Sequence, residues 1–191
     1  MQRCKHGGSI ARVFGSMFFA IAVAASAAGA KSPTAGDSVA VKSYSAGAKK
    51  LLTQSRVRVL APTRVPGSWG PATYPTVQAY TDFARHVRVG YDVVLGAAGC
   101  TGSTACTQAD VYGEKAPPVA QTRLDGNVLS ATLADGTHAK YTLGRCGANC
   151  AGSFNLQFVK GGFVYTISIK GGTLAEGLLI AAHLRPVAEL P

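Results

Sequence analysis

Acidic residues, tryptophan and the common catalytic motifs are scarce or missing in this 191-residue sequence. Asp and Glu number 9 against 19 Lys and Arg, and no pair of carboxylates has a spacing that argues for acid–base catalysis. A Gly-x-Ser-x-Gly elbow, a His-Glu-x-x-His pair, a phosphate-binding loop and a Gly-x-Gly-x-x-Gly fingerprint are all absent. The sequence therefore predicts no catalytic residue, no cofactor and no metal ion.

The first 30 residues have the pattern of an export signal. Three basic residues come first: Arg3, Lys5 and Arg12. An apolar stretch over residues 13–25 follows, and Ala28-Gly29-Ala30 supplies the small side chains that signal peptidase accepts, with residues 25–27 as a second choice. A retained membrane anchor is the alternative, but the stretch is shorter than the roughly 20 apolar residues that span a bilayer. We predict cleavage after Ala30, a periplasmic or secreted protein, and no membrane span after processing.

Basic residues outnumber acidic ones in the exported part as well. Loss of the three basic residues of the signal lowers the formal net charge from +10 to about +7. Such an excess attracts anionic partners, although a basic surface that only keeps the protein soluble is the simpler explanation. The charges are scattered, so no polyanion-binding tail or specific recognition of nucleic acid is predicted. A weaker hypothesis is electrostatic binding of an anionic polymer through four arginines: Arg56, Arg58, Arg85 and Arg88.

Residues 31–55 differ in composition from the rest of the exported chain. They are rich in Ser, Ala and Gly and contain few large apolar side chains. Such a composition buries little surface, so we predict a flexible spacer here and a single disulfide-braced domain over residues 56–191. A short helix over residues 46–54, with Leu51 and Leu52 as its apolar residues, is a weaker expectation.

Strand patterns begin at residue 56. Apolar and basic residues alternate over residues 56–60, with the period of two that a half-buried strand shows. Prolines and glycines between residues 62 and 75 then indicate a long irregular connection that contains Trp69. Further strand candidates are residues 86–89, 91–95, 109–112, 127–133, 137–143, 153–159 and 163–169.

Two turns predict antiparallel hairpins in the second half of the chain. Asp135-Gly136 separates two alternating runs, and Lys160-Gly161-Gly162 separates the next two. We therefore predict an antiparallel meander of three or four strands over residues 127–169. The side chains expected on its inner face are Val128, Ala139, Tyr141, Leu143, Phe154, Leu156, Phe158, Tyr165, Ile167 and Ile169.

A C-terminal helix is predicted from a capping box. The Thr173 hydroxyl accepts from the amide of Glu176, and the Glu176 carboxylate accepts from the amide of Thr173. An apolar stripe follows and ends before Pro186; its members are Leu174, Leu178, Ile180, Ala181 and Leu184. The stripe must be buried, and the meander is the available partner. The predicted fold class is α+β: an antiparallel meander packed by a C-terminal helix, with an irregular Pro/Gly-rich segment.

The cysteines outside the signal fall in two close pairs, Cys100/Cys106 and Cys146/Cys150. Loop closure costs least entropy between near neighbours, so we expect local disulfides that brace hairpin tips. Pairing across the tips, such as Cys100 with Cys146, stays open. Neither pair has the Cys-x-x-Cys spacing of a thiol–disulfide catalyst. A zinc site is disfavoured because only the second pair has a ligand spacing and an exported protein is oxidised.

Histidines and aromatic residues define no catalytic site. His86, His138 and His183 are far apart in sequence, and an ordinary solvated imidazole is expected at each. A binding surface is best sought in the Pro/Gly-rich segment, because adaptable loops tend to carry binding residues. Its candidates are Trp69, Tyr74, Tyr80, Phe83, Arg85 and Arg88. An aromatic lid over the open side of the sheet is the simpler alternative for these aromatic residues.

The order of features over residues 91–184 resembles that of small exported bacterial proteins with two close cysteine pairs. The matching segments are Tyr91-Asp92-Val93-Val94-Leu95, Cys100, Cys106, Leu133-Ala134-Asp135-Gly136, Cys146-Gly147-Ala148-Asn149-Cys150, Gly162-Phe163-Val164-Tyr165-Thr166-Ile167 and the Leu-rich final helix. The resemblance implies an exported bacterial protein with an α+β domain, and it implies no activity.

Together these features favour a non-enzymatic envelope protein, a binding or structural module, whose partner is an envelope protein or an anionic polymer. The alternative is an envelope hydrolase with a dispersed site around one of the histidines, because catalytic triads assemble from distant positions.

Overall fold

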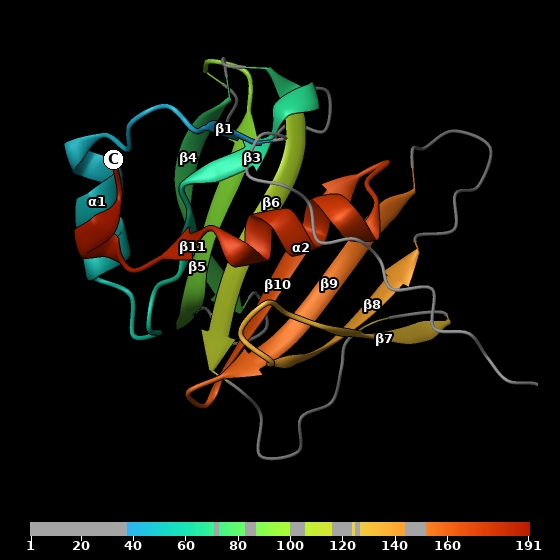
Figure 1. Cartoon of the computed structure of the whole chain (residues 1–191). Coiled ribbons are helices and arrows are strands. Elements are labelled where there is room, and N and C mark those ends of the chain that lie inside the picture. The colour runs from blue at the N-terminus through green and yellow to red at the C-terminus, as the bar shows by residue number, and fades with distance from the viewer. Residues whose placement is uncertain are drawn as a thin grey trace, which may run out of the picture.

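The computed structural model describes residues 38–70, 73–82, 87–99, 106–115, 124, 127–143 and 152–191 (Figure 1). The predicted export signal at residues 1–30 lies outside these ranges.

An antiparallel sheet forms the body of the domain. Within the described ranges its strands are β4 (Tyr74–Asp82), β5 (Val87–Gly96), β6 (Thr107–Lys115), β7 (Val128–Thr132), β8 (His138–Leu143), β9 (Ser153–Lys160) and β10 (Phe163–Lys170). The seven strands lie in the order β4-β5-β6-β10-β9-β8-β7. Consecutive pairing of β7 to β10 confirms the predicted meander, and the antiparallel pairing of β10 with β6 joins it to the three earlier strands.

Both predicted hairpin turns form. Between β7 and β8, Gly136 adopts a φ of +82°, and Asp135 Oδ1 accepts a hydrogen bond of 3.0 Å from the amide of Thr137. Between β9 and β10, Gly161 and Gly162 adopt φ values of +61° and +80°. Glycine takes this left-handed backbone without the clash that a Cβ causes, so the residue type fixes where the strands reverse.

One face of the sheet carries the core. Most of the predicted inner side chains are buried there: Ala139, Phe154, Leu156, Phe158, Tyr165, Ile167 and Ile169. One prediction is wrong. Val128 pairs with Thr142 and so lies on the opposite face, because the turn sets a register one residue away from the assumed one. Leu143 keeps the inner register opposite Phe154 but is 60% exposed, at the end of β8.

Helix α2 (Leu174–Ala182) crosses the inner face over β9 and β10 (Figure 1). Its capping box forms as predicted: Thr173 Oγ1 accepts from the Glu176 amide, and Glu176 Oε2 accepts from the Thr173 amide. The helix ends at Ala182, ahead of Pro186. A sheet with a helix packed on its apolar face confirms the α+β class.

The close approach of α2 to the sheet depends on a glycine. A Cβ built on Gly177 would lie 2.4 Å from Phe154 Cε1, far inside van der Waals contact. The apolar side chains of the helix, led by the fully buried Ile180, therefore reach the sheet directly. No helix in the described part of the chain has the length and apolar content needed to cross a bilayer.

Residues 38–55 belong to the folded domain, so the predicted flexible spacer is wrong for this part. Strand β1 (Ser38–Ala40) pairs with β3 (Arg64–Pro66), and helix α1 (Ala46–Thr53) contacts β4. Four side chains of the segment join the core: Val41, Tyr44, Ala48 and Leu52. The short helix is confirmed, with Leu52 buried and Leu51 39% exposed. These four buried side chains are enough to attach a segment of mostly small and polar residues to the core.

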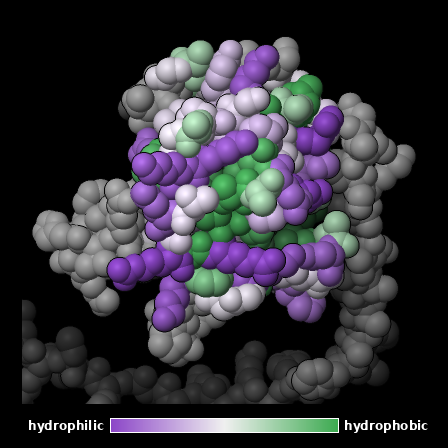
Figure 2. All heavy atoms as spheres, turned by 90° about the vertical axis from the view of Figure 1, so that its left-hand side faces the viewer, coloured by the Kyte–Doolittle hydropathy of each residue, from purple (hydrophilic) through white to green (hydrophobic). Residues whose placement is uncertain are grey.

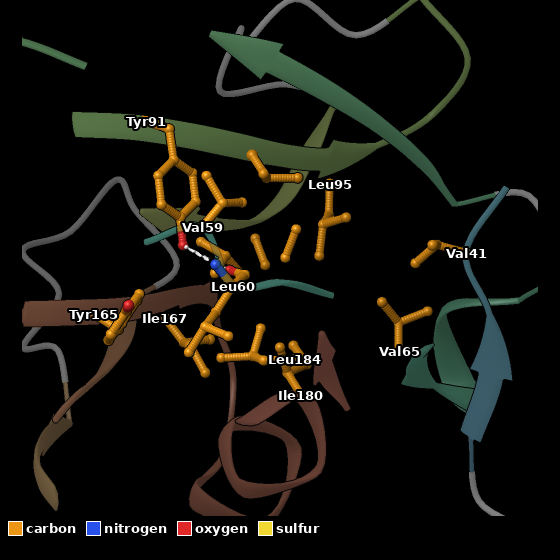
Figure 3. Packing of buried hydrophobic residues seen from close by; sticks show 14 of the residues in the cluster. Val41, Val59, Leu60, Val65, Tyr91, Leu95, Tyr165, Ile167, Ile180 and Leu184 are labelled. Atoms are coloured by element: carbon orange, nitrogen blue, oxygen red, sulfur yellow. Dashed lines mark hydrogen bonds between the residues drawn. The ribbon is translucent and has the colours of Figure 1, made fainter. Parts of the chain in front are cut away.

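The alternating residues 56–60 have no regular secondary structure, with bends at residues 56 and 57, which corrects the predicted strand. Burial alternates as expected, since Val57 and Val59 are buried while Arg56 and Arg58 are exposed. The segment lies across the inner face beside β5 and β10, where its valines join the core (Figure 3). Period-two burial thus arises here without a hydrogen-bonded strand partner.

The Pro/Gly-rich segment is more regular than predicted. Strand β2 (Ala61–Pro62) pairs with β11 (Leu184–Arg185), and the 3₁₀ turns η2 (Gly67–Trp69) and η3 (Val187–Glu189) follow β3 and β11. Strand β4 is absent from the predicted strands because Pro75 interrupts its pattern. In the described chain β4 is an edge strand, where a residue without an amide hydrogen is tolerated.

Candidate functional site

A pocket opens where the C-terminal end of α2 leaves the sheet. Its volume is about 240 Å³, and its walls come from the segment before β2, the β7–β8 turn, the end of β9 and the start of β11. The lining residues are Leu60, Leu133, Ala134, Asp135, Phe158, Lys160, Ala181, Ala182, Leu184 and Arg185. Segments far apart in the sequence therefore build one cavity.

The floor of the pocket is held by tyrosine hydroxyls. Tyr91 Oη on β5 donates to the carbonyl of Leu60 at 2.6 Å and accepts from the amide of the same residue at 2.9 Å (Figure 3). Tyr165 Oη on β10 donates to the carbonyl of Arg58 at 2.7 Å. These bonds satisfy three backbone groups of a segment that has no strand partner, and they place Leu60 over the sheet.

Aromatic stacking supports the same floor. The rings of Phe158 and Tyr165 stack across β9 and β10, with centroids 5.4 Å apart. Phe158 is buried, and with Leu60, Leu133 and Leu184 it forms the apolar base of the pocket. A floor fixed by stacked rings and paired strands is preformed, as small-molecule sites usually are.

The end of α2 forms a second wall. Leu184 and Arg185 pair with Pro62 and Ala61, which closes the chain back onto the segment that carries Leu60. Arg185 Nη1 donates to the carbonyls of Ala182 and Leu184 at 3.0 and 2.8 Å. A guanidinium at this position satisfies carbonyls left unpaired at the helix C-terminus and complements the helix dipole.

The rim of the pocket is charged. Lys160 Nζ, at the end of β9, donates to Asp135 Oδ2 in the β7–β8 turn at 2.6 Å. The hydrogen bond from Lys160, followed by those from Thr137, holds the pKa of Asp135 well below its usual value. Across the opening, Arg185 Nε lies 3.9 Å from Glu189 Oε2. The residues that line the pocket thus include two cations and one carboxylate.

Figure 2 shows the side of the molecule that carries α1 and the C-terminus. Apolar surface gathers at the centre of this face, and hydrophilic side chains surround it. The pocket itself combines an apolar base with charged residues at its opening, which suits a ligand whose apolar part enters while its polar end stays in water. In the sequence, Asp135 and Lys160 read only as turn residues. The sequence could not predict the pocket, because it forms only where the β7–β8 and β9–β10 turns meet near the end of α2.

The structure divides the predicted aromatic site. Trp69 packs against the core, and its Nε1 donates to Glu176 Oε1 of α2 at 3.3 Å. Tyr74 starts β4, 37% exposed, on the face opposite the core, and Tyr80 pairs with Gly90 further along the strand. Trp69 and Tyr74 therefore lie on different sides of the sheet. Phe83 lies outside the described residues.

The structure describes the side chains of only two of the four predicted basic residues. Arg56 and Arg58 are exposed beside the pocket-forming segment. Arg88 lies in β5 opposite Thr81, and its side chain is outside the described part, as is the whole of Arg85. The anionic-polymer hypothesis therefore stays a prediction.

Of the predicted disulfide cysteines, Cys106 alone falls in the described ranges. It lies directly before β6 and is disulfide-bonded. Cys100, Cys146 and Cys150 lie outside the described residues, so the pairing stays a prediction.

Two of the three histidines are described. His138 begins β8 and is exposed, as expected. His183 is the C-cap of α2, and partial burial, followed by the charges of Arg64 and Arg185, lowers the pKa of its imidazole. Among the described residues neither imidazole is hydrogen-bonded to a hydroxyl or a carboxylate. His86 lies outside this part of the chain.

A pair of carboxylates meets on the outer face of the sheet. Asp92 pairs with Tyr112, and Asp110 pairs with Val94, so the two acids are diagonal neighbours on β5 and β6. Burial, and then the charge of Asp110, raises the pKa of Asp92 to about 7. Its Oδ1 is buried and has no hydrogen-bond partner among the described residues. Their separation of 18 positions hides this neighbourhood in the sequence, because strand register creates it.

Comparison of the chain with protein-family models, curated proteins and solved structures finds no match, so a functional proposal must rest on the chain's own residues.

Proposed function

We propose that this protein is an exported, non-enzymatic binding module of the bacterial envelope, periplasmic or secreted, and that the pocket at the end of α2 is its binding site. The observation that carries the proposal is the preformed open pocket of about 240 Å³, which has Leu60, Phe158 and Leu184 at its base and charged side chains at its opening. Stacked rings and tyrosine hydrogen bonds hold this cavity open in the folded chain.

The export part of the proposal rests on sequence. The basic start, the apolar stretch and the small residues up to Ala30 follow the pattern of a cleaved signal. Local disulfides within Cys100/Cys106 and Cys146/Cys150 belong to the same proposal, because an oxidising compartment forms and preserves them. The resemblance to small exported bacterial proteins points the same way.

A ligand screen by nuclear magnetic resonance tests the binding site. Isotope-labelled mature protein, residues 31–191, is titrated with a library of small aliphatic and aromatic compounds of each charge. We expect amide shifts to cluster at Leu60, Phe158 and Leu184. The substitution Ala181→Leu narrows the pocket and should weaken every such ligand, whereas Ala188→Leu makes the same change at an exposed position outside the lining.

Two results would contradict the proposal. Shifts that cluster elsewhere, or that survive Ala181→Leu unchanged, would remove the pocket as the binding site. Turnover of ester, peptide or glycoside substrates that one substitution abolishes would instead favour the dispersed hydrolase site around a histidine.

A further inference from the structure

We infer that the pocket binds the chain of a medium-length anionic amphiphile, an aliphatic tail with a carboxylate or phosphate-monoester head, and that Lys160 and Arg185 bind the head. This inference rests on the proposed function and names its ligand class. It follows from three properties of the pocket: its size, its interior and the charges at its opening.

Size limits the tail. A volume of about 240 Å³ corresponds to roughly eight water molecules at their share of bulk volume. A methylene group takes up about as much space as a water molecule, so a straight chain of roughly eight carbons fills the cavity. A full-length membrane lipid tail does not fit, and a two-carbon acid leaves most of the interior empty.

The base of the pocket favours an apolar group, whereas most of the pocket's exposed surface is polar. Its deep residues are aliphatic or aromatic: Leu60, Leu133, Phe158 and Leu184 are all buried. The backbone amide of Leu60 already donates to Tyr91, so it has no hydrogen left for a ligand, and the Leu60 carbonyl already accepts from Tyr91. A polar group buried here would lose its bonds to water without replacement, whereas a methylene chain loses none.

The opening selects a negative charge. Asp135 is the sole carboxylate in the lining, and its two oxygens accept from Lys160 and from the Thr137 amide. The Lys160 ammonium has three donors and gives one to Asp135. Lys160 and Arg185 are both partly exposed, so an anion at the opening meets cations that water still reaches.

Chain length and head charge test the inference separately. Binding of hexanoate, octanoate, decanoate, octyl phosphate, octylamine and octan-1-ol to the oxidised mature protein is measured by amide shifts below the micelle concentration. Affinity should rise by at most about fourfold per methylene, the value for complete burial, up to roughly eight carbons and then level off. Octylamine should bind at least tenfold more weakly than octanoate. The octanoate and octyl phosphate arms distinguish a fatty acid from a phosphate-bearing ligand.

Matched variants locate the head. Lys160→Gln and Arg185→Gln should each weaken octanoate about two- to fivefold, as expected for exposed charges, and leave octan-1-ol unchanged. Lys140→Gln removes an exposed cation of β8 outside the pocket and should change neither ligand. If Arg185→Gln unfolds the end of α2, Lys160→Gln still decides the question.

The possible results distinguish failure of the ligand class from failure of the pocket as a binding site. Octylamine or octan-1-ol that binds in the pocket as tightly as octanoate would overturn the anionic class and leave the binding module standing. Affinity that rises as steeply from octanoate to decanoate as from hexanoate to octanoate would overturn the length limit. Absence of binding by every probe, together with an empty ligand screen, would overturn the pocket itself.

Discussion

The hydroxyl of Tyr91 bonds to both backbone groups of Leu60, donating to its carbonyl at 2.6 Å and accepting from its amide at 2.9 Å. The Tyr91 hydroxyl thereby bonds the two backbone groups of Leu60 that a neighbouring strand would otherwise bond. Because Leu60 lines the pocket, this pair links the stability of the fold to the shape of the candidate site.

Loss of this hydroxyl should be costly. Tyr91→Phe leaves a buried amide and a buried carbonyl unpaired, and we expect it to lower the free energy of unfolding by roughly 2–4 kcal/mol. Tyr165→Phe is the matched control: it removes one bond, to the partly buried Arg58 carbonyl, and should cost about 1 kcal/mol. Urea titration measures both. Equal losses of stability in the two variants would show that the second hydrogen bond between Tyr91 and Leu60 adds nothing.

Asp92 should make stability fall as pH rises. Its pKa is raised from 3.8 to about 7, so folding favours the protonated acid. The stabilisation is complete below pH 4 and is lost as pH rises through 7. Asp92→Asn should therefore leave stability at pH 4 nearly unchanged and raise it at pH 8, by up to about 4 kcal/mol. Thermal unfolding at the two pH values measures the difference.

Asp135 is a control because the pKa of its carboxyl is shifted in the opposite direction to that of Asp92. Its pKa is lowered, mainly by the hydrogen bond from Lys160, so the ionised form stabilises the fold and this contribution is lost as pH falls below the usual range of the carboxyl. Asp135→Asn should lower stability slightly at neutral pH. A gain at pH 8 in both variants would trace the effect to overall charge rather than to the surroundings of Asp92.

Two glycine substitutions in helices should have opposite effects. At Gly177 an added methyl would lie 2.4 Å from Phe154 Cε1, so we expect Gly177→Ala to cost about 1–3 kcal/mol despite the better helix propensity of alanine. At Gly47 in α1 the nearest neighbouring atom, Ser45 Oγ, is 3.9 Å away, so Gly47→Ala should stabilise by up to about 1 kcal/mol. Denaturant midpoints compare them. A neutral Gly177→Ala would mean that α2 lies further from the sheet.

The cysteines should be oxidised within each close pair. Mass mapping of an unreduced digest should recover Cys100 with Cys106 and Cys146 with Cys150. Each bridge closes a short loop, so the double substitution Cys146→Ser with Cys150→Ser should cost only about 2 kcal/mol. Recovery of Cys100 with Cys146, or of free thiols, would contradict local pairing.

Local features of the sequence determined the elements of the second half of this protein. Turn glycines after Asp135 and Lys160 place the hairpins, period-two patterns define β8 to β10, and Thr173 with Glu176 starts α2. Each of these signals is short-range: a backbone conformation or a cap that a few residues decide by themselves.

Only the tertiary structure decided which segments meet. Residues 56–60 carry a strand pattern but pair with no strand, and tyrosine hydroxyls from β5 and β10 bond three of their backbone groups instead. Residues 38–55 look like a spacer, yet Tyr44 and Leu52 are buried. The pocket joins Asp135 to Lys160 and Leu60 to Leu184. Such neighbours arise from strand register and from the packing of α2, which depend on the whole chain at once, and no local pattern encodes them.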